Sequence, residues 1–457
     1  MKWLTNISTY VKVSFVMGHY NISGTTAVKL AESVEAAIDA GHLPPGQRLP
    51  AIRALAQQVR VNRNTVTAAY QRLAAAGLVI SDGRRGTRVA AAAPAIVPAL
   101  GVTAPASHVR RLDVGGPDPQ FLPALGPVLS ELMPPLHTYG EETNLPELLD
   151  IGHAYFGGDG YTQGRLAVVG GALDGLERLL RIHLRPGDRV GMEDPGFLAG
   201  VALVRSMGFT PVPIAMDEDG PLPDAFASAL RQHVRAVILT PRAQNPTGAV
   251  ISASRANALR QQLDEHPEIL VIEDDHAGPI ADAPAVSVAY NRAGSWAILR
   301  SVAKFLGPDL RLGFVLGDKV TVARLEGQMA LGVRWVSHIL QHTVVRLWND
   351  PATHELMASA ARTYADRRNA LLDALAEREI PAVGPSGLNV WVPVPSEISI
   401  VQALLEKGWA VAPGEGFRIN SAPGIRIMTA RLELVEVDRF ADDLAQALSP
   451  IRFVSQV

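Results

Sequence analysis

Residues 269–276 read Ile-Leu-Val-Ile-Glu-Asp-Asp-His, an aliphatic run that ends in acidic side chains and a histidine. A run of this kind is typical of a short strand that is buried on both faces of a sheet. Acids that directly follow such a strand lie at its carboxyl end, where open α/β sheets collect their chemistry. We therefore predict that this stretch forms part of a ligand site in an α/β domain.

Similar apolar runs lie on either side of this stretch and alternate with helical patterns, which favours a doubly wound, mostly parallel sheet. They cover residues 166–169, 189–192, 236–239, 296–299 and 312–316.

Two further polar residues follow these predicted strands. Asn245 begins an Asn-Pro-Thr-Gly turn after residues 236–239, and Lys304 ends the segment Ser-Val-Ala-Lys after residues 296–299. A lysine desolvated in a pocket can form a Schiff base with an aldehyde, and an aspartate such as Asp274 can hold a pyridinium nitrogen protonated. Taken singly, each has an ordinary explanation, as a surface lysine, a turn amide or a loop acid. Their joint occurrence at strand ends favours a site.

A glycine pair, Gly170-Gly171, joins the strand at 166–169 to a helix that opens with Ala172. Backbone N–H groups at such a junction can approach a phosphate, although this signal is weak by itself. Phe197 could stack on an aromatic cofactor or simply fill the core.

From about residue 112 onward, these motifs resemble the fold type I pyridoxal phosphate enzymes of the aspartate aminotransferase superfamily. The resemblance implies that Lys304 forms the internal aldimine, Asp274 pairs with the pyridine nitrogen, and Asn245 binds the ring hydroxyl. It further implies that Phe197 stacks on the ring, and that the phosphate is bound by Gly171, Ala172, Ser301 and Arg311. Tyr139 would reach a phosphate across a dimer, and Arg426 would clamp an α-carboxylate.

The chain departs from this family pattern at two places. His276 stands where a tyrosine is usual; an imidazole could donate to the ring hydroxyl but would change the electronics of the aldimine. Gly170 and Ala172 replace the usual serine or threonine ligands of the phosphate. Both changes fit a sensor better than a fast catalyst.

The sequence pattern of the N-terminal region predicts three short helices followed by a hairpin. Leu30, Val34 and Ile38 recur every four residues, a second helix covers about 52–59, and Asn62 is a natural N-cap for a third. Glycines within 82–86 permit a tight turn between two short strands. The alternative is a generic three-helix cap with a basic loop, but the order of the motifs favours a winged helix-turn-helix.

This region resembles the GntR family, which implies operator binding as a dimer. The residues expected to contact DNA lie on the second helix, at the start of the third helix and in the wing: Arg53; Arg63, Asn64, Thr65 and Thr67; and Arg84 and Arg85.

The joint organisation resembles the MocR subfamily of GntR regulators. It implies a homodimeric, domain-exchanged, pyridoxal phosphate-binding transcriptional regulator that senses an amino compound, or a vitamin B6 compound itself, through Lys304. Two alternatives stay open at this point: an active aminotransferase with an accessory N-terminal domain, and a regulator whose pocket has lost the cofactor.

Composition limits the remaining choices. The 457 residues carry a net charge of -3, so DNA contact must come from local clusters of arginine and lysine. No cysteine is present, which excludes disulfides and thiolate metal sites, and we expect no metal, no membrane span and a cytoplasmic location. We expect four regions: an N-terminal arm (1–23), the winged helix-turn-helix (24–89), a linker (90–111), and the aminotransferase-like domain (112–457), its large part about 112–350 and its small part about 351–457.

Overall fold

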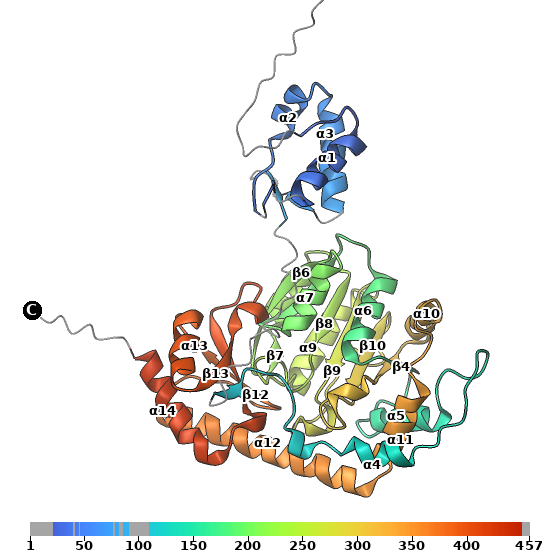
Figure 1. Cartoon of the computed structure of the whole chain (residues 1–457), viewed down its shortest axis with the longest axis vertical. Coiled ribbons are helices and arrows are strands. Elements are labelled where there is room, and N and C mark those ends of the chain that lie inside the picture. Colours follow the sequence, from blue (N-terminus) through green and yellow to red (C-terminus); the bar gives the residue numbers. More distant parts are fainter. Residues whose placement is uncertain are drawn as a thin grey trace, which may run out of the picture. The chain divides into compact units, whose positions relative to one another are not determined.

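The computed structural model describes residues 22–39, 42–44, 46–75, 78–81, 86–90 and 109–449 (Figure 1). The chain divides into two compact units, residues 1–97 and 98–457. Among the described residues, no helix is long and apolar enough to span a bilayer.

The N-terminal unit has the helices and the hairpin that the sequence predicts. They are α1 (Ala27–Asp39), α2 (Ile52–Gln58), α3 (Arg63–Ala75), β1 (Val79–Ser81) and β2 (Thr87–Val89). The two strands pair antiparallel, and the Oδ1 of Asn62 accepts a hydrogen bond from the backbone N of Asn64 at 3.0 Å, as an N-cap does. The Tyr70 hydroxyl donates to the Pro50 carbonyl at 2.8 Å and so ties α3 to the entry of α2.

An eight-stranded sheet forms the centre of the second unit, in the order β4-β11-β10-β9-β8-β5-β6-β7. Its strands are β4 (Arg165–Val169), β5 (Arg189–Asp194), β6 (Thr210–Asp217), β7 (Gly220–Pro221), β8 (Ala236–Leu239), β9 (Leu270–Asp275), β10 (Trp296–Ser301) and β11 (Gly313–Gly317). The strands β6, β5, β8, β9 and β10 run parallel, and β11 runs antiparallel to both of its neighbours.

The strand runs predicted from the sequence are confirmed, but β6 was not predicted. Pro211 and Pro213 interrupt its apolar pattern and remove two backbone donors. The strand tolerates them because it lies near the edge of the sheet, where its outer neighbour β7 is very short.

Helices cover both faces of this sheet (Figure 1). Along β4, Leu166 and Val168 pack into one apolar cluster while Ala167 and Val169 pack into another, as the alternation of strand side chains requires. The first cluster includes side chains of α5 (Pro146–Gly157), α8 (Pro223–Leu230), α9 (Ala253–Asp264) and α11 (His338–Trp348). The second includes α6 (Ala172–His183), α7 (Leu198–Ser206) and α10 (Lys319–Ala330). The strands are therefore buried on both sides, and their polar side chains gather at the ends.

The long helix α12 (Pro351–Glu377) leads to the small part, which has its own sheet and core. The sheet order is β12 (Asn389–Pro393), β14 (Gly424–Met428), β13 (Trp409–Pro413) and β3 (Arg110–Leu112), and α13 (Glu397–Glu406) and α14 (Val437–Leu448) pack with it. Short helices complete the described chain: α4 (Leu125–Glu131), η3 (Pro119–Phe121), η4 (Gly278–Ile280), η5 (Pro308–Leu310), η6 (Gly414–Phe417), η7 (Thr429–Arg431) and η8 (Leu434–Glu436).

The strand β3 lies where the sequence predicted the end of the linker. Residues 110–112 pair in parallel with β13, although a run of Arg-Arg-Leu has no apolar alternation that would mark a strand. The first described strand of the second unit therefore belongs to the small part.

The small part is tied to the large sheet at the end of β5. The Asp194 carboxylate accepts hydrogen bonds from the backbone N–H groups of Ile419 and Ser421 at 2.9 Å, and from that of Asn420 at 2.6 Å.

Candidate functional site

Asp274, at the end of β9, is a buried carboxylate with one oxygen left unpaired. Its side chain is buried, and its Oδ1 has no hydrogen-bond partner among the described residues. Burial raises the pKa of Asp274 to about 7, the charge of Asp275 adds to this rise, and Lys304 opposes it. Because an unpaired buried carboxylate is costly, this oxygen indicates a place for a ligand that donates a hydrogen bond.

Lys304 lies after β10 and close enough to Asp274 for their charges to interact. Its Nζ donates to the carbonyl of Gly115. Burial and the nearby charge of Arg426 lower the pKa of Lys304 to about 8, against the attraction of Asp274. At neutral pH about a tenth of such an amine is uncharged, which makes it far more nucleophilic than a surface lysine.

His276 is held in one tautomer by the loop that carries Asn245. Its Nε2 lies 3.0 Å from the carbonyl oxygen of Ala243, which can only accept, so Nε2 carries the hydrogen. Burial and the charge of Lys304 lower the pKa of His276 to about 4, so the ring is neutral at pH 7. Its Nδ1 therefore bears a lone pair, and it has no partner among the described residues. The free nitrogen can only accept, which differs from the donor expected from the sequence.

Arg426, on β14, brings the small part into contact with the loops of the large sheet. It is buried, its Nη1 lies 3.3 Å from the Oδ1 of Asn245, and its Nη2 donates to the Asp113 carbonyl. The guanidinium carbon lies 4.9 Å from the centre of the Phe417 ring. Burial lowers the pKa of Arg426 to about 10, so it stays protonated at neutral pH and can bind a carboxylate.

The predicted phosphate end of the site lies at the N-terminus of α6. Gly171 is the N-cap of this helix with φ at +96°, and a Cβ there would lie 3.0 Å from Arg311 Nη2. The same Nη2 donates to the Gly170 carbonyl at 3.1 Å. Ala172 begins the helix, and buried Ser301 accepts from the backbone N of Ala303 through its hydroxyl. A helix N-terminus beside an arginine favours an anion.

Two other predicted residues have different surroundings. Phe197 is half-buried at the N-cap of α7. Tyr139 is 79% exposed, and its ring lies 4.9 Å from the guanidinium carbon of Arg334 and 5.9 Å from the ring of Trp335. Among the described residues, the ring of Tyr139 therefore contacts Arg334 and Trp335 and not the predicted phosphate-binding residues.

Several predicted DNA contacts are exposed at the start of α3 and on α2. Arg53, Arg63 and Asn64 are exposed, Thr65 is half-buried, and the Thr67 hydroxyl donates to the Arg63 carbonyl at 3.0 Å. The wing residues Arg84 and Arg85 lie outside the described residues.

Two backbone groups of the site were not predicted: the carbonyls of Asp113 and Gly115, which accept hydrogen bonds from Arg426 and Lys304, respectively. The glycine pair Gly115-Gly116 before Pro117 was the available signal, because it permits close approach of the backbone to a pocket. Among the described residues, no group of histidine, aspartate and glutamate side chains could hold a metal ion.

Comparisons with known proteins match both units. The model of aminotransferase class I and II matches residues 130–444, and the model of bacterial regulatory proteins of the gntR family matches residues 26–89.

Two relatives are similar through both units. The vitamin B6 salvage pathway transcriptional repressor PtsJ of Salmonella typhimurium is 40% identical over 94% of this chain and 100% of its own length. The HTH-type transcriptional regulator TauR of Rhodobacter capsulatus is 26% identical over 86% of this chain and 90% of its own.

The second unit also resembles solved aminotransferase structures. The kynurenine aminotransferase of Pyrococcus horikoshii superposes with a TM-score of 0.68 at 22% identity, over 75% of this chain and 91% of its own. This likeness shows the fold alone.

Proposed function

The chain belongs to the class I and II aminotransferase family and carries a gntR-family domain ahead of it, and on this basis we propose that it is a MocR-type transcriptional regulator that binds pyridoxal 5'-phosphate. The observation that carries the proposal is the likeness to PtsJ, which runs through both units. Because PtsJ is named a repressor of vitamin B6 salvage, we infer that the effector is a vitamin B6 compound, alone or together with an amino compound.

The residues of the pocket fit this cofactor. The unpaired Oδ1 of Asp274 suits a protonated pyridine nitrogen, and the cradle at Gly171, where a Cβ would meet Arg311, suits a phosphate. Pyridoxal phosphate, when bound, supplies an aldehyde that condenses reversibly with amines and a ring that withdraws electrons.

The chain's own groups divide the work of binding. Lys304 provides the amine, and its lowered pKa keeps part of it uncharged at neutral pH. Asn245 and the Nδ1 of His276 would hold the ring hydroxyl, with His276 accepting the hydroxyl hydrogen because its own N–H is donated to Ala243. Phe197 would stack on the ring, and Ser301 and Ala172 would border the phosphate.

Arg426 gives the site its preference for a carboxylate. Its Nη2 now donates to the Asp113 carbonyl, and a ligand carboxylate would replace that weaker acceptor with a charged one. We therefore infer that amino acids bind better than the corresponding amines without a carboxylate.

The N-terminal unit would read operator DNA through the exposed start of α3, with Arg63 and Asn64 reaching base edges and Arg53 on the backbone. A regulator that acts on DNA would work in the cytoplasm.

We infer that the protein is a homodimer. Large apolar side chains are exposed near Tyr139: Met133 at 90%, Leu136 at 95% and, on the turn that leads to Arg334, Leu331 at 92%. A second copy over this surface would bury them, and would let Tyr139 reach the partner's phosphate as the family resemblance implies. Exchange of domains between the copies is part of the same proposal.

The test is a titration of the purified chain with pyridoxal phosphate, pyridoxal and candidate amines, followed by absorbance and by binding to the DNA upstream of its own gene. We expect a cofactor absorbance band that Lys304→Ala removes, together with DNA binding that changes as the band forms. Steady production of a keto acid without operator binding would instead support the aminotransferase, which the similarity to full-length regulators does not favour. The absence of any band would indicate a pocket that has lost the cofactor.

A further inference from the structure

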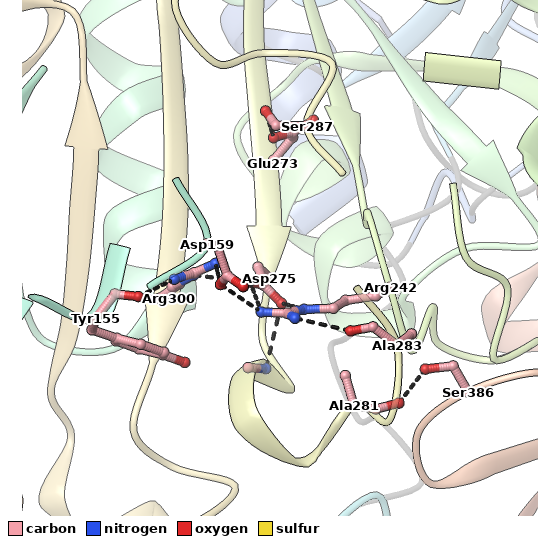
Figure 2. A network of polar contacts seen from close by, with 11 residues as sticks. Tyr155, Asp159, Arg242, Glu273, Asp275, Ala281, Ala283, Ser287, Arg300 and Ser386 are labelled. Carbon is pink, nitrogen blue, oxygen red and sulfur yellow. Dashed lines mark hydrogen bonds and ion pairs between the residues drawn. The ribbon is translucent and has the colours of Figure 1, made fainter. Parts of the chain in front are cut away.

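A buried ion-pair cluster lies at the ends of the central strands (Figure 2). The Asp275 carboxylate accepts two bonds from Arg242, Nε to Oδ1 at 2.9 Å and Nη2 to Oδ2 at 2.8 Å. Its Oδ2 also accepts from the Nε of Arg300 at 2.9 Å. The side chains of Asp275 and Arg300 are 1% and 0% exposed, so these bonds form away from water.

Both arginines are fixed at their outer ends as well. Each directs Nη2 toward Asp159, whose side chain is 28% exposed, and Arg242 Nη1 donates to the Ala283 carbonyl at 3.0 Å. Arg300 Nη1 donates to the Tyr155 carbonyl at 2.7 Å, and its guanidinium carbon lies 4.6 Å from the centre of the Tyr155 ring. Asp275 is therefore the inner centre of the cluster and Asp159 its outer edge.

Each inner member of the cluster comes from a different chain segment that also carries a pocket residue. Arg242 follows β8 and precedes Asn245, and Asp275 follows Asp274 on β9. Arg300 lies on β10 ahead of Lys304.

The pairing of β9 with β10 sets Arg300 directly opposite Asp275. Because neighbouring residues of a strand point to opposite faces, Asp275 binds its arginines on the face away from Asp274. The cluster thus joins the three segments that deliver the amide, the carboxylate and the amine, without contacting the pocket itself.

The cluster also gives the adjacent carboxylates of Asp274 and Asp275 pKa shifts in opposite directions. Although burial raises the pKa of Asp275, the hydrogen bonds and charge of Arg242 and the charge of Arg300 outweigh it, so the pKa falls below its ordinary value. Among the residues that the structure describes, no arginine binds Asp274, whose pKa is raised by burial. Asp275 is therefore an anion that is bound by two arginines, whereas the Oδ1 of Asp274 remains available to a ligand.

We propose that Asp275 is a positioning residue for the cofactor site: by binding Arg242 and Arg300, it fixes Asn245, Asp274 and Lys304 relative to one another. This inference rests on the proposed function, since it assumes that the pocket binds pyridoxal phosphate. Asp275 would act through the strand ends and not by contact with the ligand.

The test compares Asp275→Asn with Asp159→Asn in the full-length protein. Each change removes one carboxylate from the same two arginines, but only Asp275 adjoins Asp274. The measurements are the affinity for pyridoxal phosphate, the pH midpoint of the absorbance of the bound cofactor, and the thermal midpoint without cofactor.

We expect Asp275→Asn to weaken cofactor binding by about tenfold or more. It should also move the pH midpoint to a lower value, because the loss of a nearby negative charge favours deprotonation. Asp159→Asn should leave the pH midpoint unchanged and weaken binding by less than about threefold, even if it lowers the thermal midpoint. Equal effects of the two variants would overturn the proposal, because they would indicate a role in stability alone.

A second variant covers the case in which Asp275→Asn does not fold. Arg242→Lys keeps the charge but removes the two-point bond to Asp275. It should weaken cofactor binding while leaving the pH midpoint in place, and unchanged binding would contradict the proposal. Failure of the wild type to bind pyridoxal phosphate would instead refute the proposed function, so the two failures are distinguishable.

Discussion

Arg426 and Asp113 are joined by a hydrogen bond from the guanidinium Nη2 to the backbone carbonyl, so the arginine that would bind a ligand carboxylate is already paired with the chain. The same arginine reaches Asn245 through Nη1. For the Arg426 guanidinium, a neutral ligand is no better a hydrogen-bond acceptor than the Asp113 carbonyl. A carboxylate is a stronger acceptor because it is charged.

We predict that Arg426→Leu reduces the affinity for an amino acid by about tenfold to a hundredfold and leaves the affinity for the matching amine unchanged. Calorimetric titration of the cofactor-loaded protein measures both. Arg439→Leu, which removes an arginine on α14 that packs over Trp409, is the control and should change neither. Equal losses for both ligands would show that Arg426 does not read the carboxylate.

Cofactor attachment should depend on pH through Lys304. Its lowered pKa of about 8 means that the reactive, uncharged amine increases as the pH rises through that value and levels off above it. Affinity for pyridoxal phosphate, measured by absorbance, should therefore rise with pH and reach a plateau. Lys304→Ala should remove the band, and Lys319→Ala, a change at an exposed lysine, should not. A pH-independent affinity would contradict the role of Lys304.

Asp274→Asn should stabilise the cofactor-free protein while weakening cofactor binding. The pKa of Asp274 is about 7 in the folded chain and 3.8 in the reference state, so folding favours its protonated form. As the pH rises from about 4 to about 7, the Asp274 carboxyl therefore lowers the free energy of unfolding by an increasing amount, which is at most about 4 kcal/mol.

The variant should unfold at a higher temperature than the wild type at pH 8 and at the same temperature at pH 4. Thermal unfolding followed by circular dichroism measures this. A variant that is less stable at pH 8 would show that Asp274 has a partner in the folded chain.

Arg63→Ala should weaken specific operator binding by about 1–3 kcal/mol if Arg63 makes a bidentate base contact. Arg72→Ala, at the last turn of the same helix, is the matched control. Fluorescence anisotropy with specific and scrambled duplexes compares them. If both variants lose the same affinity for both duplexes, Arg63 contributes only general charge.

Leu136→Asp and Leu331→Asp should shift the protein from dimer to monomer, because each places a charge in the surface proposed to bind a second copy. Val435→Asp changes a side chain that is also 87% exposed, but on η8, and should leave the dimer intact. Sedimentation over a range of concentrations measures the difference. A wild type that is monomeric at all concentrations would exclude the homodimer.

The central strands and the polar residues that follow them could be predicted. Burial on both faces of the sheet leaves long aliphatic runs with polar residues only at the ends. Asn245, Asp274 and Lys304 follow such runs, so their placement at one edge follows from the pattern. The strand β6, with its prolines, and β3, with its two arginines, lack that pattern and were missed.

The contacts between distant segments could not be predicted in the same way. In the sequence, Asp275 is not distinguished from a loop acid that follows a strand. Only the register of β9 with β10 brings Arg300 opposite it. Likewise, nothing in the sequence shows that Ala243, with φ at +51°, turns its carbonyl toward His276 and so determines which nitrogen of that ring is free.

The placement of β3 beside β13 has a mechanical consequence. The first described residues of the second unit join the small sheet and not the large one, so the chain enters this unit on the same part that carries Arg426. Because β3 is hydrogen-bonded to β13, residues 110–112 would follow any movement of the small part. A ligand that binds Arg426 would therefore act on the part of the second unit to which residues 110–112 belong.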